Sequence, residues 1–138
     1  MAQASQLDQE TDRPGLRVEL FVLDLPRSVA FYGDILGFEV RRVGPTGYTS
    51  ISRDGAVIGL NDVKRLPFDH PARPEPGQTL GLGVELVVMV EDVAALYARA
   101  TASTAQVSAL VAQAWGLTDF RVTDPDGYYI RITGLSTA

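Results

Sequence analysis

The fold is decided by the stretch Arg17-Val-Glu-Leu-Phe-Val-Leu-Asp24, because Glu85-Leu-Val-Val-Met-Val-Glu-Asp92 repeats its pattern in the second half of the chain. Each stretch is an apolar run typical of a strand, and it ends in an acidic residue suited to cap a helix. Further along, Asp54-Gly55 in the first half corresponds to Asp126-Gly127 in the second, and both dipeptides favour a hairpin turn. The sequence therefore predicts a duplicated module.

The apolar spacing divides both halves into the same elements. A strand leads to Asp24 or Asp92 as the helix N-cap, and a helix with one apolar face follows. Gly37 ends the first helix. Strands are then expected near 18–22, 38–43, 47–53 and 56–61 in the first half, and near 84–90, 106–112, 117–123 and 127–133 in the second. Each half is predicted to be a βαβββ unit.

The 138 residues, 46% of them hydrophobic, suffice for one core shared by both units. We expect a polar, disordered tail over 1–15 and a single domain over 16–134. The domain comprises module one at 16–61, a linking loop at 62–83 and module two at 84–134. Four prolines in that loop discourage regular structure, so it is expected to be a cover or a linker.

Composition excludes several classes of function. The formal charge is −5 without a basic patch, so nucleic acid is not an expected partner. No apolar run approaches the roughly 20 residues of a membrane helix, and no basic region precedes an apolar run at the N-terminus, so we expect a cytoplasmic protein without membrane contact. The chain has no cysteine, which excludes disulfides, thiolate metal sites and a cysteine nucleophile.

Several short motifs follow the repeat in a characteristic order: Phe31-Tyr32, Leu36-Gly37-Phe38, Trp115-Gly116 and Asp124-Pro125-Asp126-Gly127. With the two βαβββ units, these motifs resemble the vicinal oxygen chelate superfamily over roughly residues 16–134. That superfamily includes glyoxalase I, bleomycin-resistance proteins and extradiol dioxygenases. The resemblance implies an α+β fold in which two tandem βαβββ modules form an open, cavity-enclosing mixed sheet.

The resemblance also implies where a metal would bind. Metal-dependent members carry His, Gln or Glu on the first and last strand of each module, and the matching positions here hold Arg17, Gly59, Glu85 and Arg131. Glu85 is the only candidate metal ligand at a family position, whereas a catalytic divalent cation needs at least three protein ligands or many oxygens. We therefore expect neither a metal nor another cofactor.

Two interpretations of the substituted centre stay open. Arg17 and Arg131 could bracket Glu85 with bidentate hydrogen bonds, which would make the cluster a structural plug of the cavity. Alternatively, the surplus positive charge could capture a carboxylate or phosphate of a small molecule. Glu19 shares the strand face of Arg17 and is the one further carboxylate nearby.

Other residues complete the predicted ligand-binding set. Strand parity directs Phe21, Tyr48 and Met89 toward the cavity. Trp115 is expected to pack in the core or at the rim, and in the sharper interpretation it stacks on a planar ligand. His70, the only histidine, is expected to be solvated in the linking loop, since no second imidazole, nucleophile or acid accompanies it.

Four aspartates invite a catalytic interpretation, but their positions favour a structural one. Asp24 and Asp92 stand directly before helical patterns, and Asp124 and Asp126 belong to a turn. No catalytic residue is therefore named.

Three function classes remain. We expect a metal-free small-molecule-binding protein similar to bleomycin-resistance proteins, which sequesters an antibiotic or another small ligand between the modules as a homodimer. The alternative is a metal-dependent glyoxalase-like lyase or isomerase, or a dioxygenase. A third class is a protein whose cavity is filled by its own side chains and which acts in a complex with another protein. Metal content separates the first two.

Overall fold

The computed structural model describes residues 15–135, so the expected tail lies almost entirely outside the described residues. Module one consists of β1 (Val18–Val22), α2 (Leu25–Ala30), a π-helix η1 (Phe31–Ile35), β2 (Glu39–Val43), β3 (Thr49–Arg53) and β4 (Ala56–Asp62). A 3₁₀ turn, η2 (Val63–Arg65), opens the linking loop. Module two consists of β5 (Glu85–Met89), α3 (Val93–Thr101), β6 (Gln106–Val107), β7 (Val111–Ala112), β8 (Leu117–Thr123) and β9 (Tyr129–Leu135). No helix in this range has the length and apolar composition of a membrane span.

Each module builds its own sheet with the same topology. The strand order is β1-β4-β3-β2 in module one and β5-β9-β8-β6 in module two, where β7 also pairs with β8. The first strand of each module lies parallel to the last one, and the remaining pairs are antiparallel. This equivalence confirms the predicted α+β fold of two βαβββ modules.

Both helix starts are as predicted. Asp24 accepts a hydrogen bond from the Arg27 amide at 3.2 Å, and Asp92 accepts one from the Ala95 amide at 3.0 Å. The first helix, however, widens into η1 at Phe31. Two hydrogen bonds hold the C-terminal end of η1. The Phe38 amide donates to the Tyr32 carbonyl, and the Arg99 side chain of α3 donates to the Asp34 carbonyl.

The strand expected near 106–112 is in fact two short strands. Val107 pairs with Val122, whereas Val111 pairs with Asp119. The chain therefore advances by four residues from β6 to β7 while β8 advances by three. The extra residue is a bulge, at which the Ser108 side chain accepts the Arg121 amide at 2.8 Å. The strand expected at 127–133 begins two residues later, because 125–128 form the turn.

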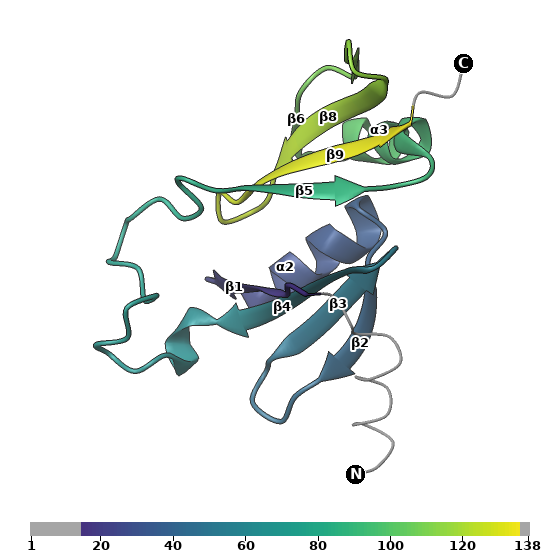
Figure 1. The fold of residues 1–138 in the computed structure, drawn as a ribbon. Helices are drawn as coiled ribbons and strands as arrows, with labels where there is room; N and C mark the ends of the chain where they lie inside the picture. The colour runs from purple at the N-terminus through teal and green to yellow at the C-terminus, as the bar shows by residue number, and fades with distance from the viewer. Residues whose placement is uncertain (1–14, 136–138) are drawn as a thin grey trace.

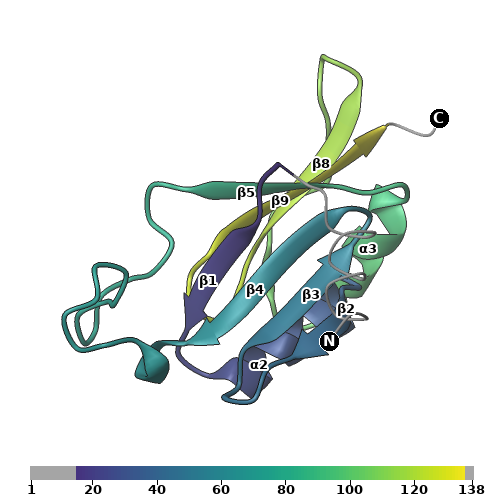
Figure 2. The same ribbon diagram turned by 60° about the horizontal axis from the view of Figure 1, so that its bottom comes forward.

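One hydrophobic core holds both modules together. It combines residues from the apolar face of each sheet, such as Leu60 and Ile132, with Tyr32 and Leu96 from the helical segments. The ribbon shows α2 lying between the two sheets (Figure 1). The strands of the two sheets cross, and the linking loop projects on the side opposite α3 (Figure 2). Each sheet therefore turns its second, polar face away from the shared core.

The turn between β8 and β9 fastens module two onto module one. Tyr32 is fully buried and donates its hydroxyl hydrogen to Asp124 Oδ2 at 2.7 Å. Asp126 accepts hydrogen bonds from the Leu23 amide at 3.2 Å and from the Ser28 hydroxyl at 3.3 Å. The predicted turn role of both aspartates is thus confirmed, and it is joined by a contact between modules. Burial raises the pKa of Asp124 and of Asp126, and burial, reinforced by Asp124, raises the pKa of Tyr32 well above 10.0.

This buried tyrosine predicts a specific alkaline weakness. A raised pKa means that the folded state keeps the Tyr32 proton after the unfolded chain has released it, so stability is intact below pH 10 and falls above it. Each pH unit above 10 should cost about 1.4 kcal/mol through this one group. Urea unfolding between pH 9 and 11.5 should therefore show a steeper decline for the wild type than for Tyr32→Phe. Parallel curves would mean that the Tyr32 hydroxyl is not buried.

Candidate functional site

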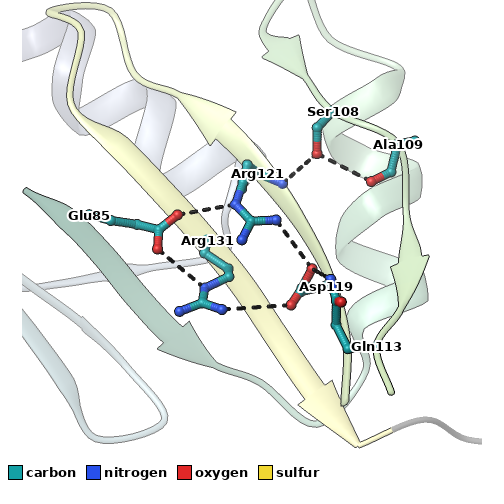
Figure 3. Close-up of polar contacts among 7 residues, drawn as sticks. All are labelled: Glu85, Ser108, Ala109, Gln113, Asp119, Arg121 and Arg131. Atoms are coloured by element: carbon teal, nitrogen blue, oxygen red, sulfur yellow. Dashed lines mark hydrogen bonds and ion pairs between the residues drawn. The ribbon is translucent and has the colours of Figure 1, made fainter. Parts of the chain in front are cut away.

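Four charged side chains form a closed ring on the polar face of the module-two sheet (Figure 3). Glu85 comes from β5, Arg131 from β9, and Asp119 and Arg121 from β8. The strand register puts them on one face, because Arg121 pairs with Arg131 across the hairpin and Asp119 lies two residues before Arg121. Acidic and basic groups alternate around the ring, so its formal charge is zero.

The two arginines are held unequally. Arg121 Nε donates to Glu85 Oε2 at 3.1 Å, and its Nη1 lies 3.5 Å from Asp119 Oδ1. Arg131 Nε lies 3.4 Å from Glu85 Oε1, and its Nη1 lies 4.0 Å from Asp119 Oδ2. Arg121 therefore makes the shorter contacts with the two carboxylates of the ring, and Arg131 makes the longer ones.

Several polar atoms of the ring are buried, where an unmade hydrogen bond is costly. Asp119 is 1% exposed, and Gln113 Nε2 donates to its Oδ1 at 3.0 Å. Three buried polar atoms of the same face, Asp119 Oδ2, Arg131 Nε and Thr133 Oγ1, have no hydrogen-bond partner among the described residues. Although Arg131 Nε and Asp119 Oδ2 lie within ion-pair distance of opposite charges, the geometry gives them no hydrogen bond.

The corresponding face of module one carries a smaller polar group. Glu19 Oε2 lies 4.0 Å from Arg17 Nη2, and Glu19 Oε1 accepts from Asn61 Nδ2 at 3.4 Å. A Cβ atom at Gly59 would overlap the Glu19 carboxylate and come within 2.8 Å of the Tyr48 hydroxyl. Glu19 thus occupies the space that a side chain at this family position would need.

The prediction that Arg17, Glu85 and Arg131 form one cluster is wrong for Arg17. Arg17 directly precedes β1 of the other sheet and pairs with Glu19, and Arg121 takes its place beside Glu85. The predicted surplus of positive charge is absent too, because Asp119 supplies a second carboxylate. Sequence reasoning missed both β8 residues.

The remaining predicted residues are dispersed. Phe21 packs against the His70 ring, with centroids 6.1 Å apart, so the histidine is half-buried rather than fully solvated. Met89 is on the face of the ring but 55% exposed. Trp115 is 64% exposed in the loop before β8, which extends beyond the sheet, so the expected packing is not found (Figure 2).

The donor set does not fit the metal that the family resemblance implies. Of the four family positions only Glu85 has a coordinating side chain, and its two oxygens face Arg121 and Arg131. Within residues 15–135 no three His, Cys, Asp or Glu side chains gather closely enough to hold an ion. Two guanidiniums would also repel a cation at this point.

The larger hollows among residues 15–135 lie elsewhere in the fold. One of about 410 Å³ runs between the first helical segment and the turn after β8, beside Phe31, Ala105 and Pro125. The other, of about 700 Å³, is framed by the linking loop, Leu23 and Asp126. The buried acid beside the first hollow, Asp124, already accepts three hydrogen bonds, so most of its acceptor capacity is used within the fold.

Comparison with solved structures supports the fold. TioX from Micromonospora sp. ML1 has 22% identity and a TM-score of 0.69, covering 88% of this chain and 100% of its own. A protein of unknown function from Agrobacterium tumefaciens str. C58 has 24% identity and a TM-score of 0.70, covering 89% and 94%. Lactoylglutathione lyase from Agrobacterium tumefaciens has 21% identity and a TM-score of 0.64, covering 88% and 94%. These likenesses establish fold and not activity.

A comparison with curated protein sequences gives no match. The model of the Glyoxalase/Bleomycin resistance protein/Dioxygenase superfamily, in contrast, matches residues 16–132, which span both modules and the loop between them. The paired βαβββ modules described above agree with this match. The chain therefore belongs to the Glyoxalase/Bleomycin resistance protein/Dioxygenase superfamily.

Proposed function

We propose that this protein binds and sequesters a small molecule, such as an antibiotic, on the polar face of the module-two sheet, without a resident metal and without transforming its ligand. The observation that carries the proposal is that the Arg131 side chain lacks a hydrogen bond at Nε. Its guanidinium lies next to two carboxylates, yet its buried Nε makes no hydrogen bond among the described residues. Such a group is a ready donor, because a ligand that satisfies it recovers the cost of burying it.

The surroundings of the ring suit a binding surface. Large apolar side chains from three strands share its face and are exposed, namely Val87, Met89, Val111, Tyr129 and Leu135. A face that combines apolar area with a few polar groups is typical of small-molecule sites. Trp115, at the end of the projecting loop, supplies an exposed aromatic surface for stacking.

We also propose that a second copy of the chain covers this face in a homodimer. Exposed apolar patches of this kind are characteristic of interaction sites. β5 is an edge strand whose outer side has no partner strand within residues 15–135. Covering it would enclose the ring in a cavity. Sedimentation equilibrium should accordingly give twice the chain mass, and a monomer at all concentrations would exclude this arrangement.

Replacing Arg131 should affect ligand binding more than folding. A thermal-shift screen of small molecules, antibiotics included, identifies ligands of the wild type through their stabilisation of the folded state. For these ligands Arg131→Ala should weaken binding at least about tenfold, the effect of losing one charge-assisted hydrogen bond. Arg65→Ala, an exposed arginine of the linking loop, is the matched control and should bind normally. Unchanged binding to Arg131→Ala would refute the assigned site.

Metal analysis separates the proposed function from the metal-dependent alternative. After incubation with Zn²⁺, Ni²⁺, Mn²⁺ or Fe²⁺, the purified protein should carry no stoichiometric metal and show no thermal stabilisation. One tightly bound ion per chain with a clear rise in Tm would instead support a lyase, isomerase or dioxygenase. Glu85→Gln, which removes the one coordinating carboxylate at a family position, would then abolish that rise.

A further inference from the structure

Three buried polar atoms on neighbouring residues of the binding face lack hydrogen-bond partners among residues 15–135. Asp119 and Thr133 are directly opposite each other on β8 and β9, and Arg131 is the next residue on the same face of β9. Asp119 and Thr133 are 1% and 2% exposed. Asp119 Oδ2, Arg131 Nε and Thr133 Oγ1 are the buried side-chain polar atoms without a hydrogen bond in residues 15–135. Native structures rarely leave such atoms unpaired, so their occurrence at three neighbouring positions requires an explanation.

The three atoms specify a mixed pattern of hydrogen bonding. Asp119 Oδ2 can only accept, Arg131 Nε–H can only donate, and the Thr133 hydroxyl can do either. A carboxylate or phosphate would satisfy Arg131 but place negative charge against Asp119. An ammonium group would satisfy Asp119 but oppose Arg131. An uncharged group with a donor and an acceptor on neighbouring atoms satisfies all three.

We infer that the ligand of this face presents a carboxamide, ureido or lactam edge to Asp119, Arg131 and Thr133. This inference rests on the proposed binding function and names its ligand class. The ligand N–H donates to Asp119 Oδ2, and the ligand carbonyl accepts from Arg131 Nε–H and from the Thr133 hydroxyl. The charge-neutral ring agrees with an uncharged ligand group, because neither sign of charge is left in excess.

Entry to the three atoms is along Arg131. Its contacts are the longest in the ring, at 3.4 and 4.0 Å, and its side chain is 26% exposed. Rotation about its Cδ–Nε bond moves Nη1 away from Asp119 while Nε keeps its place, which opens the space above Asp119 and leaves the shorter contacts of Arg121 intact. Arg121 and Gln113 then hold Asp119 Oδ1, so Oδ2 remains free for the ligand.

Thr133 offers a sharp test, because valine has the same shape without the hydroxyl. Acetamide, sodium acetate and methylammonium chloride are added separately to ¹⁵N-labelled full-length protein at equal ionic strength. The readout is the Arg131 Nε–H signal, assigned by its loss in Arg131→Lys. Acetamide should shift this signal in a saturable manner, and Thr133→Val should fold normally while binding acetamide about tenfold more weakly. Thr49→Val, which removes a buried hydroxyl bonded to the Gly47 carbonyl at 3.4 Å in the other sheet, should bind acetamide normally.

Failure of this inference can be told from failure of the binding function. A signal that follows acetate or methylammonium instead of acetamide overturns the uncharged ligand class but keeps the binding face. Equal acetamide binding by Thr133→Val and the wild type also overturns it, as does a crystal structure in which a fixed water bridges the three atoms and acetamide does not displace it. If neither the probes nor any compound of the thermal-shift screen contacts this face, the binding function itself is refuted.

Discussion

Asp124→Ala should lower the free energy of unfolding by about 3–5 kcal/mol, the range for breaking a buried hydrogen-bond network. The carboxylate is 4% exposed and accepts bonds from the Tyr32 hydroxyl at 2.7 Å and from the amides of Asp126 and Tyr128, both at 2.9 Å. Alanine leaves all three donors without their acceptor. Because Tyr32 belongs to module one, the loss should also weaken the attachment between the modules.

Asp92→Ala is the control for this result. Asp92 is an exposed N-cap with a single bond to the Ala95 amide, so its loss should cost only about 1 kcal/mol. Urea denaturation of the three proteins gives both differences. Equal losses for the two variants would mean that Asp124 acts as an ordinary turn residue and that the contact with Tyr32 contributes little.

Arg121→Ala should destabilise the protein by about 2–3 kcal/mol, below the full cost of breaking a buried ion pair because the side chain is partly exposed. Arg121 makes the shorter contacts of the ring and is the main support of the buried Asp119. Arg131→Ala, in contrast, removes contacts of 3.4 and 4.0 Å and should cost about 1 kcal/mol.

The two arginine variants together decide between a plug and a binding centre. If Arg121 is structural and Arg131 binds the ligand, urea midpoints fall mainly in Arg121→Ala, whereas ligand affinity falls mainly in Arg131→Ala. A large and equal loss of stability in both variants, with ligand affinity unchanged, would show that the whole ring is a plug. The apolar replacement Arg121→Met distinguishes lost charge from lost packing.

The repeated pattern of strand and acidic cap was sufficient to predict the fold. Apolar alternation located nearly all strands, and Asp24 and Asp92 do cap their helices. The π-helix at Phe31 and the bulge near Ser108 were not predictable, because both depend on contacts with distant segments. The bond from Tyr32 to Asp124, 92 residues apart in the chain, is of the same kind.

The site was predicted in part. The family positions led to Glu85 and Arg131, which do lie together, but Arg17 lies beside Glu19 in the other module instead of beside them. Asp119 and Arg121 carried a signal that was overlooked. Counting outward from the Asp126-Gly127 turn pairs residues 121 and 131, and alternation then places residue 119 on the same face. No sequence pattern indicates that Arg121 makes shorter contacts than Arg131.

The most direct test of the proposed binding face is to map where a ligand binds. Compounds from the thermal-shift screen are titrated into ¹⁵N-labelled protein, and the perturbed amide and arginine Nε–H signals are assigned. Perturbations are expected at Glu85, Asp119, Arg121, Arg131 and Thr133, and the affinity should be lost in Arg131→Ala. Perturbations confined to the hollow beside Phe31 and Pro125, or to the hollow framed by the linking loop, would contradict the proposed binding face.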